Sequence, residues 1–208
     1  DPVIINPEYI YIVPSITTYY DKTSTTVSGS QIESDIRATA TTFSTNNLER
    51  FGNKLRYSRF TRSLDNITTG SILNNDVTIS LEKRFVPNIN KSERLLLNFN
   101  NKIRKGTLSS TEFTYKSFPA YLDDDSLGNV NIYRYNDAKV KTNIITNAGT
   151  VDYNTGQVEI NNFAPSAYAD TQLKVSITPD TFDVSPVREQ ILLMDSASAI
   201  ITIVSETT

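Results

Sequence analysis

The clearest helical pattern in the sequence covers residues 28–52, SGSQIESDIRATATTFSTNNLERFG. Ser30 followed three residues later by Glu33 is a capping box, which marks the start of a helix. Several threonines disfavour the helix, so packing must hold it, and Gly52 stands where a left-handed C-terminal residue belongs. The apolar side chains recur at helical spacing: Ile32, Ile36, Ala40, Phe43, Leu48 and Phe51. We therefore expect one long amphipathic helix packed on a sheet.

The segments that flank this helix are typical of strands. Ile4–Val13 is apolar on both faces, which indicates a central strand covered on both sides. Val77–Phe85 alternates apolar and polar residues, which predicts a half-buried strand, and Asn74-Asn75-Asp76 before it predicts a turn. A short second helix is expected over Leu55–Leu64. Residues 1–90 are therefore predicted to form a strand-helix-helix-strand unit.

Beyond this unit the sequence predicts short strands, mainly antiparallel, so the expected fold class is α+β. A hairpin is expected around Asn154-Thr155-Gly156, where Gly supplies a positive φ. The expected organisation is a β-rich region over 91–170 and closing strands over 171–208. A return of the closing strands to the first sheet would make the middle region an insertion. The predicted strands are Leu95–Phe99, Phe113–Tyr115, Val130–Tyr135, Val140–Ile145, Thr150–Tyr153, Gln157–Ile160, Leu173–Ile177, Ile191–Met194 and Ile200–Val204.

Composition limits the chemistry that this chain can perform. The 208 residues contain no histidine, cysteine or tryptophan. This excludes a Ser-His-Asp triad, a thiol nucleophile, a disulfide and a zinc finger. Carboxylate, lysine or tyrosine chemistry, binding through loops, and a purely structural role remain. No apolar run approaches the ~20 residues of a membrane helix, so we expect no membrane insertion.

Carboxylates are the remaining candidates for catalysis or metal binding. Asp123-Asp124-Asp125 begins like a calcium-binding loop but has Arg134 where a bidentate Glu is needed, so we expect no metal site. A carboxylate hydrolase would need two carboxyl groups within about 5–10 Å in one cleft. The pairs Glu112 with Asp123 and Asp152 with Glu159 keep that class open as a third hypothesis.

Charge is divided unevenly along the sequence. Residues 1–105 hold 14 Lys and Arg against 10 Asp and Glu, and residues 106–208 hold 6 against 13. The net charge of −3 is the sum of +4 in the N-terminal half and −7 in the C-terminal half. Such a chain can pair head to tail with copies of itself, although two solvated faces explain the same numbers. Asp1 is not an initiator residue, so we expect the sequence to be a piece of a longer chain.

Two groups of residues are candidate protein interfaces. The first is a basic stretch with Tyr57 and Phe60 interleaved: Arg50, Lys54, Arg56, Arg59 and Arg62. Its field is too weak for phosphate-driven binding, so we expect a protein partner and no nucleic acid. The second is Tyr133 and Tyr135. Exposure of an aromatic platform made by these two with Tyr115 and Tyr121 would favour a glycan- or receptor-binding tail module, which is the alternative function.

Five segments together resemble the baseplate wedge proteins (gene product six) of T-even-like contractile-tailed phages, in the broader baseplate J-like family. The likeness runs from about Tyr9 to Ile203, and it rests on the order and spacing of the segments. They are Tyr9–Val13 with Tyr19-Tyr20-Asp21; Asn47–Gly52; Leu55–Arg59 leading to Leu64-Asp65; Gly149–Tyr153 with Gly156-Gln157-Val158; and Thr178-Pro179 with Asp183-Val184, Pro186, Arg188 and Ile191-Leu192.

This resemblance implies a structural subunit of the virion tail baseplate, assembled in the host cytoplasm. It implies a homodimer within a ring, partners among the other wedge proteins and a joint to the tail tube or sheath. It implies that the subunit holds the tail extended and transmits the switch to contraction. It implies no catalytic residue, so we expect no enzyme activity and no cofactor. It also implies that an N-terminal portion of the family protein is missing from this sequence.

Overall fold

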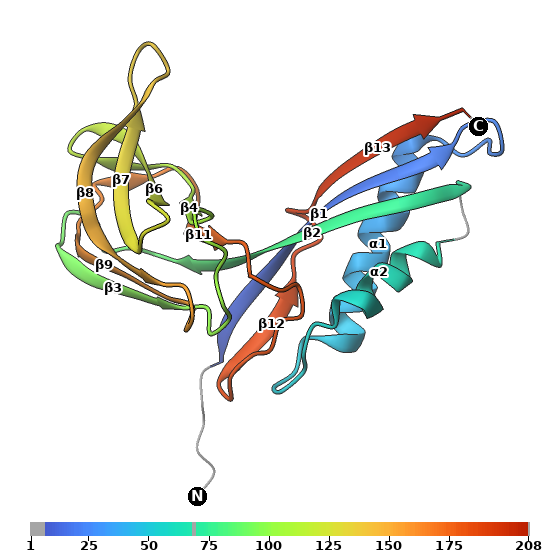
Figure 1. The fold of residues 1–208 in the computed structure, drawn as a ribbon, viewed down its shortest axis with the longest axis horizontal. Helices are drawn as coiled ribbons and strands as arrows, with labels where there is room; N and C mark the ends of the chain where they lie inside the picture. The colour runs from blue at the N-terminus through green and yellow to red at the C-terminus, as the bar shows by residue number, and fades with distance from the viewer. Residues whose placement is uncertain (1–6, 68–69, 208) are drawn as a thin grey trace, which may run out of the picture. The chain divides into compact units, whose positions relative to one another are not determined.

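A computed structural model describes residues 7–67 and 70–207 (Figure 1). The chain divides into two compact units. The first comprises Asp1–Ser80 with Thr181–Thr208, and the second comprises Leu81–Asp180. The predicted first strand begins at Ile4, and residues 4–6 lie outside the described residues. The chain is an α+β protein with a mixed sheet, as the sequence predicts.

The first unit is built on strand β1, which has neighbours on both sides. β12 runs parallel to the first half of β1 and β13 runs parallel to its second half, while β2 lies on the other side. β2 contributes residues 72–80 to this unit and 81–85 to the second. The elements are β1 (Glu8–Asp21), α1 (Gly29–Asn47), α2 (Tyr57–Asp65), β2 (Ile72–Phe85), β12 (Gln190–Met194) and β13 (Ile200–Glu206).

Alternate residues of β1 form the centre of this unit's core. Ile10, Ile12, Pro14 and Ile16 are buried, while Tyr11, Val13 and Ser15 between them are half-buried. Pro14 lies within the strand, between the last residue paired with β12 and Ser15, the first paired with β13. Proline has no backbone N–H to donate to a neighbouring strand. It is tolerated at position 14 because the partner strand changes from β12 to β13 there.

Helix α1 differs from the single long amphipathic helix that the sequence predicts. It has 19 residues, ends at Asn47, and buries only about one residue per turn. Ser28, not Ser30, is its N-cap, and the Ser28 hydroxyl accepts the N–H of Gln31 at 3.2 Å. Two consecutive asparagines favour the end of the helix, because their side chains compete for backbone hydrogen bonds. Gly52 has φ +77° in the turn closed by Asn53, so it is not the C-terminal cap.

The two helices pack on each other and on the C-terminal strands. The rings of Phe43 in α1 and Phe60 in α2 lie 5.1 Å apart, edge inclined to face. The Ser44 hydroxyl of α1 accepts the backbone N–H of Met194 at 3.0 Å, and Arg37 donates to the carbonyl of Ser196 at 2.7 Å. These contacts tie the helical layer to residues about 150 positions later in the chain. Within the described residues, neither helix is long and apolar enough to cross a membrane.

The second unit is a curved antiparallel sheet (Figure 1). Its strand order is β2-β11-β4-β6-β7-β8-β9-β3, and β5 pairs with both β6 and β10. The predicted hairpin at Asn154-Thr155-Gly156 is confirmed and joins β8 to β9. The strands are β3 (Glu93–Asn98), β4 (Ser109–Ser110), β5 (Phe113–Tyr115), β6 (Phe118–Asp124), β7 (Asn129–Tyr135), β8 (Lys141–Asp152), β9 (Gln157–Phe163), β10 (Ala167–Tyr168) and β11 (Leu173–Ile177).

The sequence prediction misses several strand segments, among them residues 74–76 of β2 and the whole of β6. The expected turn at Asn74-Asn75-Asp76 lies inside β2, because side-chain partners hold these polar residues in the strand. Asn75 accepts the Thr18 hydroxyl at 2.7 Å and donates to Asp65 at 3.0 Å. β6 was not expected, since it contains Pro119 and ends in acidic residues. Polar residues stabilise both strands through hydrogen bonds to other parts of the chain. A hydrophobic pattern cannot reveal such contacts.

Candidate functional site

The residues predicted as a protein interface fall into two surfaces, one in each unit. The basic stretch belongs to the first unit, in and before α2. Tyr133 and Tyr135 belong to β7 in the second unit. Each surface is described separately.

The basic surface follows the outer side of α2. Arg59 and Arg62 are exposed on the helix, opposite the buried side chains of Phe60 and Leu64. Arg59 Nη1 donates to Asn47 Oδ1 of α1 at 3.4 Å. The alternation of exposed arginine and buried apolar residue makes α2 amphipathic over its whole length. A partner that approaches this unit along α2 therefore meets guanidinium groups.

The loop before α2 extends the basic surface. Arg50 and Lys54 are exposed there, and Phe51 between them is 52% exposed. The sequence places Phe51 in a core-facing stripe, and that prediction is wrong. The helix ends at Asn47, so Phe51 belongs to the turn that contains Gly52. Exposed aromatic rings and arginines are enriched in protein interfaces, so Phe51 and Arg50 are the residues of this loop that favour one.

Arg56 and Asp183 fix the start of α2. Arg56 is the N-cap residue, but its side chain makes no capping hydrogen bond. Instead the carboxylate of Asp183 accepts the backbone N–H of Tyr57 at 2.8 Å and pairs with Arg56 at 3.1 Å. The Tyr57 N–H, more than the arginine, lowers the pKa of Asp183 below its usual value. Leu55 and Val184 exchange backbone hydrogen bonds beside it, at 2.9 and 3.1 Å.

Three tyrosines form an aromatic cluster on β6 and β7, here called the tyrosine cluster: Tyr121, Tyr133 and Tyr135. Tyr121 and Tyr133 are paired across the two strands, and their ring centroids lie 5.6 Å apart. Tyr135 stands edge-on to both rings, at 6.0 and 5.6 Å. Tyr135 is 53% exposed, whereas the other two are half-buried. The cluster is thus a small aromatic surface with one ring presented to solvent.

Charged residues hold the rim of the tyrosine cluster. Tyr121 donates its hydroxyl hydrogen to Glu112 at 2.5 Å, and this bond is the main reason why its pKa rises to about 12. Burial is the main reason why the pKa of Tyr133 also rises to about 12. The Lys141 ammonium lies 4.3 Å from the centre of the Tyr133 ring and pairs with Asp123. The single hydrogen of the Tyr121 hydroxyl is therefore already engaged by Glu112.

Tyr115 does not join this cluster. It lies in β5, is only 8% exposed, and packs edge-on against Phe113 at 6.5 Å. The four-ring platform that the sequence suggests is therefore reduced to three rings. Its position follows from β5, which pairs with the N-terminal half of β6 rather than with β7.

The loop that joins β7 to β8 projects beyond the strands of the second unit (Figure 1). Asn136 shapes it, since its side-chain oxygen accepts the N–H of Ala138 at 3.0 Å and of Val140 at 2.9 Å. Lys139 closes the turn with a backbone bond to Asn136 at 2.8 Å. Val140 is 57% exposed. This loop presents a shaped, partly apolar tip next to Tyr135.

The acidic cluster Asp123-Asp124-Asp125, a candidate metal site, makes structural hydrogen bonds and an ion pair instead. Asp124 is buried and accepts the N–H groups of Gly106 and Leu108, at 2.7 and 2.9 Å. Asp125 accepts N–H groups of its own loop, and Asp123 pairs with Lys141. Among residues 7–67 and 70–207, no group of three acidic side chains is arranged to hold a metal ion.

The carboxylates of the two proposed hydrolase pairs are likewise engaged. Glu112 accepts the hydroxyl of Tyr121. Asp152 accepts the N–H groups of Asn154 and Thr155 in the hairpin turn. Glu159 receives two hydrogen bonds from Arg94, at 2.7 and 2.6 Å, which lower its pKa. Each group therefore has a structural partner in this fold.

Comparison with known proteins gives one family match. Residues 8–84 match the family model for baseplate structural protein gp6, C-terminal domain III. The matched range covers β1, α1, α2 and β2 as far as Arg84, and it includes the basic surface. No curated protein matches the chain.

Proposed function

We propose, from the membership of residues 8–84 in the gp6 baseplate structural protein family, that this chain assembles with itself and with neighbouring proteins of the baseplate wedge. The family gives the coarser role directly: a structural part of the virion tail baseplate. The proposal adds a homodimer within a ring, assembly in the host cytoplasm, and transmission of the switch to contraction. It also assigns the chain no catalytic activity.

The family match is the observation that carries the proposal, and the basic surface supports it. That surface lies inside the matched range and combines exposed arginines with the exposed ring of Phe51. Arginine and aromatic residues are enriched in protein interfaces, where lysine and acidic residues are depleted. A subunit that repeats around a ring also needs two different contact surfaces. The basic surface and the tyrosine cluster are the two candidates.

Sedimentation of the purified chain over a range of concentrations tests the role of the basic surface. The double variant Arg59→Glu with Arg62→Glu should raise the dissociation constant of the dimer at least about tenfold. The control, Lys22→Glu with Arg188→Glu, makes the same change of charge at exposed sites of the same unit. It should change the dissociation constant less than about twofold. A strict monomer at the highest concentration, or equal weakening by both variants, would contradict the proposal.

Glycan or receptor binding is a second candidate, and the tyrosine cluster favours it. The exposed ring of Tyr135 can stack on the apolar face of a sugar. Binding to an array of bacterial surface glycans tests this function. Tyr135→Ala should abolish binding there, whereas Tyr168→Ala, on β10, should not. Absence of binding by the unaltered chain would exclude this candidate.

A further inference from the structure

We propose that a pocket beside residues 102–105 of the second unit, here called the cationic pocket, binds an acidic segment of another protein, whose carboxylates pair with Lys102 and Lys105. The pocket lies outside both surfaces described above. That the segment belongs to a neighbouring baseplate protein rests on the proposed function. The site itself follows from the second unit alone.

Backbone hydrogen bonds hold the segment that carries the cations. Ile103, in its middle, is buried, and its N–H donates to the carbonyl of Tyr153 at 2.8 Å. The next N–H, of Arg104, donates to the carbonyl that follows β11 at 2.9 Å, and Lys102 accepts the N–H of Asp180 at 2.8 Å. The segment is thus tied both to the β8–β9 hairpin and to the chain after β11. Its cationic side chains remain exposed.

The cationic pocket has a volume of about 420 Å³. The charged residues of its lining are Lys102, Arg104, Lys105 and Asp180, so it carries three cations and one carboxylate. The Lys105 ammonium lies over the Tyr153 ring, 5.6 Å from its centre. Among residues 7–67 and 70–207, Lys102 and Lys105 form no ion pair. Both ammonium groups are therefore available to a partner.

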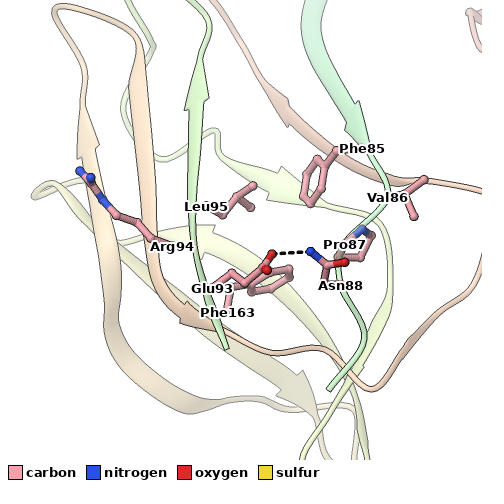
Figure 2. Close-up of a pocket in the computed structure, with 8 residues that line it drawn as sticks. All are labelled: Phe85, Val86, Pro87, Asn88, Glu93, Arg94, Leu95 and Phe163. Atoms are coloured by element: carbon pink, nitrogen blue, oxygen red, sulfur yellow. Dashed lines mark hydrogen bonds between the residues drawn. The ribbon is translucent and has the colours of Figure 1, made fainter. Parts of the chain in front are cut away.

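Another pocket of the second unit, beside β3, gives a contrast. Its lining is mainly apolar, and Figure 2 shows the hydrogen bond of 2.7 Å that Asn88 donates to Glu93 there. Glu93 also pairs with Lys91 at 2.7 Å, so its charge is balanced within the fold. The cationic pocket instead carries an excess of positive charge, which an anionic partner can balance.

Several carboxylates on one segment suit the cationic pocket better than a single free anion. A site for a small anion needs converging donors in a pocket that excludes water. Here the N–H groups of Ile103 and Arg104 are used within the fold, and the cations are exposed, where one ion pair contributes little. Carboxylates that are linked in one chain can pair with several cations at once, so their small contributions add up.

A second copy of this chain offers no matching acidic group. Asp123-Asp124-Asp125 is the only place in the sequence where acidic residues are adjacent. Asp124 is buried there, and Asp123 pairs with Lys141. Within the described part of the chain, no three acidic side chains converge closely enough to hold a metal ion. An acidic segment that matches three cations therefore comes from a different protein.

Nucleic acid is a poorer match for the cationic pocket. Single strands bind along a positively charged groove in which bases stack on aromatic rings. The second unit has a net charge of only +1, and Lys105 covers the Tyr153 ring. The local excess of positive charge thus fits a short acidic peptide.

Nuclear magnetic resonance of the ¹⁵N-labelled chain at low ionic strength tests this site. The probe is the capped peptide Ser-Glu-Asp-Glu-Asp-Glu-Ser, and the matched uncharged probe is Ser-Gln-Asn-Gln-Asn-Gln-Ser. The acidic peptide should shift the amide signals of residues 102–105 and of the β8–β9 hairpin. The uncharged peptide should bind at least about tenfold more weakly. Added salt should weaken binding of the acidic peptide, because it screens exposed charges.

A double variant tests the two lysines. Lys102→Gln with Lys105→Gln should raise the dissociation constant of the acidic peptide at least about fivefold. The matched control is Lys116→Gln with Lys139→Gln, at exposed sites of the same unit. Lys116 also lies over a tyrosine ring, 5.7 Å from the centre of Tyr115. The control should change the dissociation constant less than about twofold.

Asp180→Asn should have the opposite effect. It removes a carboxylate from the lining, so the acidic peptide should bind at least about twofold more tightly, because a like charge no longer repels it. A merely structural role of Lys102 and Lys105 would not produce this gain.

Four results would overturn the inference: no shifts with the acidic peptide, equal binding of the two peptides, binding of inorganic phosphate or of a thymidine oligonucleotide at the pocket as tight as that of the peptide, or self-association that the Lys102→Gln with Lys105→Gln variant abolishes. None of the first three would contradict the proposed function, which is tested by sedimentation of variants in α2. Conversely, a chain that binds the acidic peptide here but fails that sedimentation test would contradict the proposed function and leave the cationic pocket standing.

Discussion

At the scale of single residues, Gly149 is the glycine at which an added Cβ atom would come closest to a neighbouring atom. It lies in β8 opposite β9, and a Cβ atom there would stand 1.8 Å from the backbone oxygen of Glu159. Real Cβ atoms do not approach so closely, so the two strands would have to separate. Gly149 therefore allows the backbones of β8 and β9 to pack against each other.

Gly149→Ala should destabilise the protein by at least ~2 kcal/mol or prevent its folding, because the added methyl group overlaps a backbone atom rather than a flexible side chain. Denaturant unfolding measures the effect. Gly29→Ala is the control, since its Cβ would meet Ile203 at an ordinary 3.4 Å in the first turn of α1. That change should alter the free energy of unfolding by less than ~1 kcal/mol. Equal effects of the two substitutions would show that β8 and β9 are not so close.

Asp183 acts on α2 from a distant part of the chain. Replacement by Ala should cost ~1 kcal/mol of stability, whereas Asn, which can still accept the Tyr57 N–H, should cost less. The folded-state pKa of Asp183 is lowered, so its contribution is present above the usual pKa of an aspartate. It is lost as the pH falls through the lowered folded value. Unfolding measured at neutral and acidic pH should therefore show a smaller difference between Asp183→Ala and the unaltered chain in acid.

Tyr121 and Tyr133 predict a change of stability at alkaline pH. Both have folded-state pKa values of about 12, compared with 10.0 for an ordinary tyrosine. The folded state holds these protons more tightly, so their contribution is complete below pH 10 and is lost as the pH rises to about 12. Glu112→Gln should move the titration of Tyr121 back toward 10, as followed by the ultraviolet absorbance of tyrosinate. An unchanged late titration in that variant would contradict the role of Glu112.

At the scale of elements, the sequence predicts strands whose hydrophobic pattern is strong and misses those held by polar contacts. Most of the predicted strands lie within observed ones, because in most of them alternating apolar residues face a core. β6 was missed because its acidic end pairs with Lys141 and with loop N–H groups far away in sequence. The cap of α2 was missed for the same reason, since Asp183 lies 126 residues from Tyr57. Such long-range polar pairs leave no periodic signal.

The candidate surfaces show the same limit. In α2, Arg59 and Arg62 are exposed, whereas Phe60 and Leu64 are buried. The helical spacing of residues 28–52 wrongly includes Phe51, because α1 ends at Asn47 and breaks that spacing. The grouping of Tyr121 with Tyr133 depends on the register of β6 and β7, and Tyr115 is excluded by the pairing of β5. The register between two strands is set when the sheet folds, and it cannot be predicted from a single sequence.

At the scale of the whole molecule, the charge asymmetry of the sequence does not follow the two units. The first unit holds 8 Lys and Arg against 12 Asp and Glu, and the second holds 12 against 11. Their net charges are −4 and +1, in place of +4 and −7 for the two halves of the sequence. The basic excess of the N-terminal half comes from residues 81–105, with 7 Lys and Arg against 2 Asp and Glu, and these residues share the second unit with the acidic residues 106–180. Attraction between oppositely charged halves is therefore a weaker argument for assembly than the local basic surface on α2.

Two separate cores predict that damage to one unit stays within it. The first core is built from residues such as Ile12 and Phe60, and the second from residues such as Leu122 and Val158. A core that opens as its own cooperative unit exposes its own amides to exchange. Hydrogen exchange should therefore accelerate in residues 81–180 of a folded Gly149→Ala variant, and in residues 1–80 with 181–208 of the Asp183→Ala variant. The control is the unaltered chain at the same temperature. Uniform acceleration across both units in either variant would show that β2, which runs through both, couples them into a single cooperative structure.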